Sequence, residues 1–327
     1  MRPMIFKTLL TGFASCAMLL LHCAAQADEA PYPNRPIRMV VPFPPGSTSD
    51  LAARAIAQHI QMPLQQPVIV ENRPGANGAL GMNHVAKSRP DGYTIVVGSI
   101  SSTAVPAVML RKPSFDLARD FSPVGVIAGT PLLLVVSQDS PYKNLQELIQ
   151  AAKSQPAALT YANSAGLFQL AMESLKMQAG INLSEIAYKG PAEATTDLLA
   201  GRITVQPDSL GSASKLIDGQ RTRALAVLSS GQIPSLPGVP TMQELGYKDF
   251  DFNGWIGVLA PAGTPQPIID RLYQSMAQAI QSPEIRKIYA STGMDPVSRP
   301  PGEYRELLER EMRKYEKIRQ AAGIEQK

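Results

Sequence analysis

A loop rich in proline and hydroxyl groups offers the clearest chemistry in this chain. Residues 42–50 read Pro-Phe-Pro-Pro-Gly-Ser-Thr-Ser-Asp and lie between an apolar run and a helical pattern. At a helix N-terminus the backbone amides point outward and the helix dipole is positive, so an anion is favoured there. Gly46 allows a close approach of the backbone, and the three hydroxyl residues after it add donors. The alternative is an ordinary turn in which Ser49 or Asp50 only caps the helix.

Two more loops follow apolar runs in the first third of the chain. In residues 72–81, Asn77 could donate to a ligand; alternatively, the glycines there only make turns and Arg73 lies on the surface. Ser99 and Ser101 follow the next apolar run and bring further hydroxyls. Because ligands of parallel α/β sheets bind at the carboxyl ends of the strands, we expect these loops to share one edge with the first loop.

The second half of the chain repeats this arrangement. Residues 163–166, Asn-Ser-Ala-Gly, separate a strand-like run from a helical one, and residues 188–190, Tyr-Lys-Gly, follow another strand-like run. Lys189 could pair with a carboxylate, or it is an ordinary surface lysine. Asp208 could bind an amine or a hydroxyl, or it caps the next helix. The predicted ligand-binding residues are Phe43, Gly46, Ser47, Thr48, Asn77, Ser99, Ser101, Asn163, Ser164, Ala165, Tyr188, Lys189, Gly190 and Asp208.

The elements that must position these loops alternate between strands and helices. Apolar runs predict strands over residues 37–41, 68–70, 93–98, 132–136, 160–162, 186–188, 224–228 and 254–259. Helical patterns cover residues 50–62, 145–153, 168–179, 192–200, 265–281 and 302–322, with a short helix ending near residue 87. Thr264 is expected as the N-cap of the helix over residues 265–281, with Pro265 at its first position. This rhythm predicts an α/β fold with mostly parallel sheets and helices on both faces.

The pattern of strands and helices restarts near the middle of the chain, which predicts two lobes. We expect lobe 1 to comprise residues 28–129 and 254–327, and lobe 2 to comprise residues 130–253. The two crossings, near Gly129 and Gly254, would form a hinge, and a hinged cleft can close on a ligand. Trp255, the only tryptophan, falls at the second crossing, where we expect it to pack between the lobes rather than stack on a ligand.

The first 27 residues have the pattern of a cleavable secretory signal. Arg2 and Lys7 precede an apolar run over residues 9–21. Residues 25–27, Ala-Gln-Ala, then place alanine at the two positions that a signal peptidase reads. The run is shorter than the ~20 residues that a spanning helix needs. We therefore predict cleavage after residue 27 and a periplasmic location; the alternative is an uncleaved N-terminal anchor.

The predicted mature chain lacks the residues of most catalytic and metal sites. Both cysteines, Cys16 and Cys23, lie in the predicted signal, and only His59 and His84 remain among the histidines. The sequence has no Gly-x-Ser-x-Gly, His-Glu-x-x-His, Walker A or dinucleotide-binding motif. Removing two of the 31 basic residues with the signal leaves 29 against 27 acidic residues, which gives no reason to expect nucleic-acid binding. We therefore predict a protein that is not an enzyme and uses no cofactor or metal.

Motifs spread along nearly the whole mature chain carry a family resemblance. They are Tyr-Pro-x-Arg-Pro-Ile-Arg at 32–38, Val-Pro-Phe-Pro-Pro-Gly at 41–46, Val-Glu-Asn-Arg-Pro-Gly-Ala at 70–76, Pro-Asp-Gly-Tyr at 90–93, Tyr-Lys-Gly at 188–190, Arg-Ala-Leu-Ala-Val at 223–227, Leu-Pro-x-Val-Pro-Thr at 236–241 and Leu-Ala-Pro-Ala-Gly-Thr-Pro at 259–265. With these motifs the chain resembles the Bug/TctC-type extracytoplasmic solute receptors of tripartite tricarboxylate transporters.

The resemblance implies a type II periplasmic-binding-protein fold in which main-chain and hydroxyl donors, with ordered waters, hold the carboxylates of the ligand. The implied function is capture of a small organic anion for uptake through membrane permease subunits. Such an anion would be a mono- or dicarboxylate, an acidic amino acid or an aromatic acid. The alternative is a ligand sensor that docks on a sensor-kinase ectodomain without a dedicated permease. In both cases we expect a monomer.

Three positions depart from the family pattern near the expected pocket. Ser47 stands where a second glycine is common, and the stretch that ends at Thr103 lacks a usual histidine. Gln169 stands where the helix after residue 163 usually carries a histidine. These departures leave the identity of the ligand open.

Overall fold

The computed structural model describes residues 31–326, and the predicted signal, residues 1–27, lies outside them. By its contacts the chain divides after Asn34, and all the described helices and strands belong to the unit that begins at Arg35. No helix among residues 31–326 is long and apolar enough to cross a membrane.

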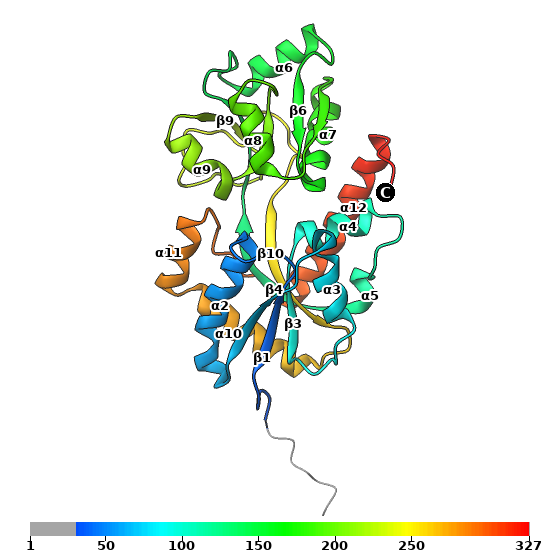
Figure 1. Ribbon diagram of the computed structural model, residues 1–327, viewed down its shortest axis with the longest axis vertical. Coiled ribbons are helices and arrows are strands. Elements are labelled where there is room, and N and C mark those ends of the chain that lie inside the picture. The colour runs from blue at the N-terminus through cyan, green and yellow to red at the C-terminus, as the bar shows by residue number, and fades with distance from the viewer. Residues whose placement is uncertain (1–30, 327) are drawn as a thin grey trace, which may run out of the picture. The chain divides into compact units, whose positions relative to one another are not determined.

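The first group of elements, here called lobe 1, is built on a five-stranded sheet in the order β2-β1-β3-β10-β4 (Figure 1). Its strands are β1 (Ile37–Val41), β2 (Val68–Asn72), β3 (Thr94–Ser99), β4 (Phe121–Thr130) and β10 (Gly254–Pro261). Strand β1 pairs in parallel with β2 and β3, whereas β10 is antiparallel to β3 and β4. The helices of lobe 1 are α2 (Thr48–Leu64), η1 (Ala76–Gly78), α3 (Ala79–Ala86), η2 (Ile100–Ser102), α4 (Ala104–Met109), α5 (Leu117–Asp120), α10 (Gln266–Ile280), α11 (Pro283–Ser291) and α12 (Pro301–Ala321).

The second group, here called lobe 2, contains two small sheets. One has the order β8-β5-β9 with antiparallel pairs, and the other pairs β6 with β7 in parallel. A bridge between Tyr161 and Val205 links the two sheets. The strands are β5 (Leu132–Ser137), β6 (Thr160–Asn163), β7 (Ser184–Ala187), β8 (Gln206–Ser209) and β9 (Thr222–Val227). The helices are α6 (Leu145–Ser154), α7 (Gly166–Ala179), α8 (Pro191–Leu199) and α9 (Leu210–Asp218).

The sheets are mixed, so the expectation of mostly parallel sheets is too strong. Three of the seven strand pairings among the described residues are parallel and four are antiparallel. One physical reason is the double connection between the lobes: β4 leads the chain out of lobe 1, β10 leads it back, and the two lie side by side (Figure 1). The predicted α/β class is confirmed, while the lobe boundaries near Gly129 and Gly254 stay a prediction.

Helix α2 illustrates why these segments fold as they do. Ala53, Ile56, Ile60 and Leu64 recur at intervals of three or four residues, and each is 2% exposed or less. This spacing places them on one face of the helix, which packs against the sheet and α10. The apolar face of α2 therefore fixes the direction in which its N-terminus points, and the first candidate loop ends there.

A single cluster of buried apolar side chains extends through both lobes. It includes Val40 and Met82 of lobe 1 as well as Leu134 and Leu148 of lobe 2. Helix α7 of lobe 2 contacts α4 and α12 of lobe 1. The lobes therefore share buried apolar surface on the side of α7, in addition to the two chain crossings.

The start of α10 differs by one residue from the expectation. Pro265 is the N-cap, with an extended ψ of 138°, and the helix begins at Gln266. Thr264, the predicted cap, instead donates its hydroxyl to the carbonyl of Pro261 at 2.7 Å. The prediction of Thr264 as the cap is wrong because the extended ψ keeps Pro265 outside the helix.

Gly257 of β10 provides a test of the packing in lobe 1. A Cβ at this position would lie 2.5 Å from Cζ of Tyr304, whose side chain is fully buried. We expect Gly257→Ala to lower the free energy of unfolding by about 1–3 kcal/mol, because a well-packed core does not accept extra volume without strain. Urea denaturation would measure the change. The control is Gly302→Ala in the first turn of α12, where an added methyl meets nothing within 4 Å; equal losses in both variants would contradict this packing.

Candidate functional site

The loop between β1 and α2 is closed by Ser47, which is the N-cap of α2. Its backbone is extended, and its hydroxyl accepts from the amide of Asp50 at 3.3 Å. The alternative, in which Ser49 or Asp50 caps this helix, is therefore wrong. Ser-x-x-Asp before an apolar run is a sequence signal of a helix N-terminus, and it identifies Ser47 as the cap.

Asp50 is the centre of a hydrogen-bond network that holds this loop. Its side chain is 2% exposed, and it accepts from the Gly46 amide at 2.9 Å, from Asn72 Nδ2 at 2.8 Å and from Arg54 Nε at 3.0 Å. Asn72 also donates to the carbonyl of Phe43 at 3.1 Å. Burial alone would raise the pKa of Asp50, but these hydrogen bonds outweigh it and hold the pKa below its ordinary value.

The Asp50 network narrows the set of donors that remain for an anion. The Gly46 amide is already bonded to the carboxylate of Asp50. The amides of Thr48 and Ser49, in the first turn of α2, have no acceptor within the helix. Thr48 is exposed and Ser49 is buried. The two amides, rather than that of Gly46, are therefore the donors that α2 can offer to a ligand.

The loops after β1, β2 and β3 meet at one edge of lobe 1, as the sequence predicted. A Cβ on Gly78 would lie 2.9 Å from Cβ of Ser102 and 3.6 Å from Cζ of Phe43. Asn77 is exposed next to this contact, with a left-handed φ of 53°. The structure thus brings Phe43 and the loops of Asn77 and Ser99 together.

Two of the hydroxyls after β3 hold the turn itself. Ser102 accepts from the Ser99 amide at 3.0 Å, and Thr103 donates to the Ser99 carbonyl at 2.7 Å. Ser101 is half-buried, and no hydrogen bond of its hydroxyl is found among residues 31–326. Ser101 is therefore the hydroxyl of this turn that stays available for a ligand.

The first loop of lobe 2 lies against lobe 1. Gly166, the first residue of α7, packs so closely on Val105 that a Cβ would lie 2.8 Å from its Cγ1. Helix α7 also contacts η2, which directly follows β3. The Ser164 hydroxyl is buried and has no hydrogen-bond partner within the described part of the chain, and Ala165 is the N-cap without a side-chain cap. Ser164 and the amides at the start of α7 therefore remain free to bind a ligand.

The side chain of Asn163 is hydrogen-bonded to the carboxylate of Glu185, which the sequence did not predict. Its Nδ2 donates to Glu185 Oε1 at 2.7 Å, and Gln169 Nε2 and the Tyr161 hydroxyl donate to Glu185 Oε2 at 2.9 and 2.7 Å. Burial and the neighbouring Glu185 and Glu173 raise the pKa of Tyr161. No local signal could reveal Glu185, because it lies 22 residues from Asn163 along the chain.

The loop after β7 is tied to the same region. The Tyr188 amide donates to the Asn163 carbonyl at 2.8 Å, and the Tyr188 hydroxyl donates to Asp197 at 2.9 Å. Burial, followed by this hydrogen bond, raises the pKa of Tyr188 to about 12. Lys189 is exposed, no ion pair of its ammonium is found among the described residues, and Gly190 is the N-cap of α8.

Asp208 lies within β8 rather than at a helix start. It is 2% exposed and accepts from the Ser209 amide at 2.8 Å and from Gln206 Nε2 at 3.2 Å. Ser209 is the N-cap of α9, so the alternative of Asp208 as the cap is wrong. Burial raises the pKa of Asp208 to about 6, although its hydrogen bonds act in the opposite direction.

Comparison with known proteins identifies the family. Residues 52–324 match the tripartite tricarboxylate transporter family receptor, TctC. The chain belongs to this family. The periplasmic binding protein BugD is 31% identical, with a TM-score of 0.75 over 90% of this chain and 100% of BugD. Rpa4515 of R. palustris, solved with adipate, is 33% identical, with a TM-score of 0.78 over 89% of this chain and 98% of that one. MatC of Rhodopseudomonas palustris, solved with bound malate, is 27% identical, with a TM-score of 0.74 over 88% of this chain and 99% of that one.

Membership of TctC confirms the family resemblance and the type II periplasmic-binding-protein fold. The family consists of substrate-binding receptors rather than enzymes, which confirms that part of the prediction. Among residues 31–326 no group of three or more His, Cys, Asp or Glu side chains could hold a metal ion.

Replacing Asp50 tests its role in holding the β1–α2 loop. A carboxyl with a lowered pKa stabilises the folded state above its unfolded pKa, and this stabilisation is lost as the pH falls through the folded pKa. We expect Asp50→Asn to lower the free energy of unfolding by about 2 kcal/mol at pH 7, since charge-assisted hydrogen bonds are lost. Denaturant titrations at pH 7 and below pH 4 should show the difference from wild type shrinking in acid. A difference that is constant with pH, or an equal loss in the exposed control Asp139→Asn, would contradict this role.

Proposed function

We propose that this protein is a periplasmic receptor that binds a small organic anion carrying one or two carboxylates and delivers it to the permease of a tripartite tricarboxylate transporter. The observation that supports the proposal is that each lobe has its own set of uncommitted hydrogen-bond donors. Lobe 1 offers the amides of Thr48 and Ser49 at the start of α2, and lobe 2 offers the buried Ser164 hydroxyl before α7.

The chemistry of these donors fits a carboxylate. Amides at helix N-termini and hydroxyls donate hydrogen bonds without carrying a charge, and the positive ends of the helix dipoles add electrostatic attraction. Lys189 is the basic residue among the predicted ligand-binding residues, so a second carboxylate could pair with it. Adipate in Rpa4515 and malate in MatC are dicarboxylates, which supports the same class for this protein.

Export to the periplasm is supported by two observations. The first 27 residues have the n-region, apolar run and small-residue site of a secretory signal. BugD, which shares the fold along its whole length, is a periplasmic binding protein. A periplasmic receptor needs a membrane partner for uptake, and the family is named for receptors of that transporter class.

A thermal-shift screen of organic acids tests the ligand class. The panel should include adipate, malate, aromatic acids and acidic amino acids, with matched amides as neutral controls. An acid present at about 100 times its Kd should stabilise the fold by about 2.7 kcal/mol and raise the Tm. If no acid raises the Tm above its neutral control, the proposed ligand class is wrong.

Thr48→Pro tests the helix-terminus site without disturbing the helix. Proline at the first helical position is well tolerated, and Ser47 before it already has the extended ψ of 157° that proline requires. The variant removes the amide hydrogen and the hydroxyl, whereas the control Thr48→Ala removes only the hydroxyl. We expect calorimetry to show at least about tenfold weaker binding of the best acid by Thr48→Pro than by Thr48→Ala, a difference of about 1.4 kcal/mol. Equal affinities in two folded variants would place the anion elsewhere.

A further inference from the structure

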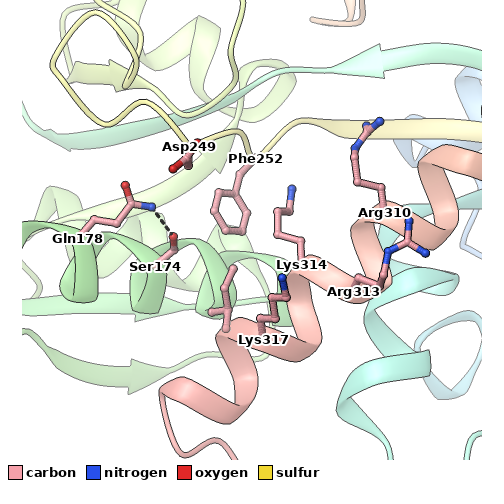
Figure 2. Close-up of a pocket in the computed structure, with 9 residues that line it drawn as sticks. Ser174, Gln178, Asp249, Phe252, Arg310, Arg313, Lys314 and Lys317 are labelled. Atoms are coloured by element: carbon pink, nitrogen blue, oxygen red, sulfur yellow. Dashed lines mark hydrogen bonds between the residues drawn. The ribbon is translucent and has the colours of Figure 1, made fainter.

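A basic groove lies between α7 of lobe 2 and α12 of lobe 1 (Figure 2), and none of the predicted ligand-binding residues lines it. Its volume is about 390 Å³. The lining residues are Ser174, Gln178, Asp249, Phe252, Arg310, Arg313, Lys314, Lys317 and Ile318. Four of them are basic and one is acidic, in a chain whose basic and acidic residues are otherwise nearly balanced.

The four basic residues form one face of α12. Arg310, Arg313, Lys314 and Lys317 follow the spacing i, i+3, i+4 and i+7, which places them on the same side of a helix. At a rise of about 1.5 Å per residue, the row is about 10 Å long. An extended peptide spans that length with about three residues. The groove therefore offers a linear row of positive charges rather than a single point charge.

Three of these four cations lack a short contact with a carboxylate. Arg310 and Arg313 reach the nearest glutamate oxygens only at 3.6 Å, whereas every other ion pair among the described residues is 3.0 Å or shorter. Charge-assisted hydrogen bonds are normally about 2.7–2.9 Å long. Lys317 is exposed and has no ion pair within residues 31–326. These three cations can therefore bind carboxylates of a partner without breaking short ion pairs within the protein.

The fourth cation, Lys314, anchors the groove. Its ammonium contacts Glu311 at 2.6 Å, donates to the carbonyl of Asp251 at 2.7 Å and lies 4.8 Å from the centre of the Phe252 ring. Figure 2 shows Lys314 extending from α12 toward Phe252. The segment that returns from lobe 2 is thereby fixed to α12, which gives the groove a defined shape before any partner binds.

We infer that this groove docks an acidic segment of a partner protein, and, resting on the proposed function, that the partner is the membrane permease. Charge complementarity favours a run of Asp or Glu side chains, because the cations form a row in which Arg310 and Arg313 have only long ion pairs and Lys317 has none among the described residues. A concave groove between two helices matches a protein segment better than it matches a flat lipid surface. A segment seated here contacts α7 and α12 together, so it touches both lobes at once.

Binding of fluorescein-labelled hexaglutamate to the full mature chain tests the groove, with hexaglutamine as the neutral probe. In low salt, fluorescence anisotropy should show saturable binding of hexaglutamate that weakens as salt is added. The double variant Arg313→Glu, Lys317→Glu should weaken binding at least tenfold. The matched control is Arg305→Glu, an exposed position on the same helix outside the groove, which should change the affinity less than twofold. Circular dichroism and an unchanged Tm establish that both variants fold.

Three results would overturn the inference. Hexaglutamate could bind no better than hexaglutamine, or the double variant could bind it as tightly as the wild type. Alternatively, phosphatidylglycerol vesicles could bind through Arg313 and Lys317 while hexaglutamate does not, which would make the surface a membrane contact. No organic acid is present in these measurements, so failure here leaves ligand binding by the loops untouched, and failure of the acid screen leaves peptide binding by the groove untouched.

Discussion

The candidate site depends on one buried carboxylate, that of Asp50. It holds the Gly46 amide and Asn72, and Asn72 holds the carbonyl of Phe43, so one side chain connects the ends of β1 and β2. Arg54 offsets its charge at 3.0 Å. Asp50 thus takes the donor that the glycine offers and leaves the amides of the first turn of α2 for a ligand. The Asp50 network thus determines which amides of this loop are left without an acceptor in the protein.

In lobe 2, too, one carboxylate holds a candidate loop through several hydrogen bonds. Glu185 accepts hydrogen bonds from Tyr161, Asn163 and Gln169, and the Asn163 carbonyl in turn accepts from the Tyr188 amide. In both lobes, polar side chains that could donate to a ligand, such as Asn72 and Asn163, instead hold a loop in place. What remains for a ligand is a smaller set of amides and hydroxyls, next to residues that these hydrogen bonds hold in place.

The sequence predicted the features that depend on neighbouring residues and missed those that depend on distant ones. Strands β1 and β3, helix α2 and the meeting of the loops at the sheet edge follow from apolar runs and turn chemistry. The antiparallel pairing of β4 with β10 joins segments more than 120 residues apart, so no local sequence pattern predicts it. The same holds for Asp50 with Asn72 and for Asn163 with Glu185, each pair separated by 22 residues. The sequence could have predicted Ser47 as the helix cap, because its spacing to Asp50 is a local signal.

Because the buried cluster extends through both lobes, it determines whether one lobe can be expressed without the other. Val40, Met82, Leu134 and Leu148 belong to one apolar core, and α7 contributes to it from the side of lobe 2. If lobe 2 were expressed alone, the apolar face of α7 would be exposed to water, which favours aggregation over folding. The two lobes are therefore not interchangeable modules: exchanging a lobe between family members would require transplanting the matching surfaces of α4 and α12 as well.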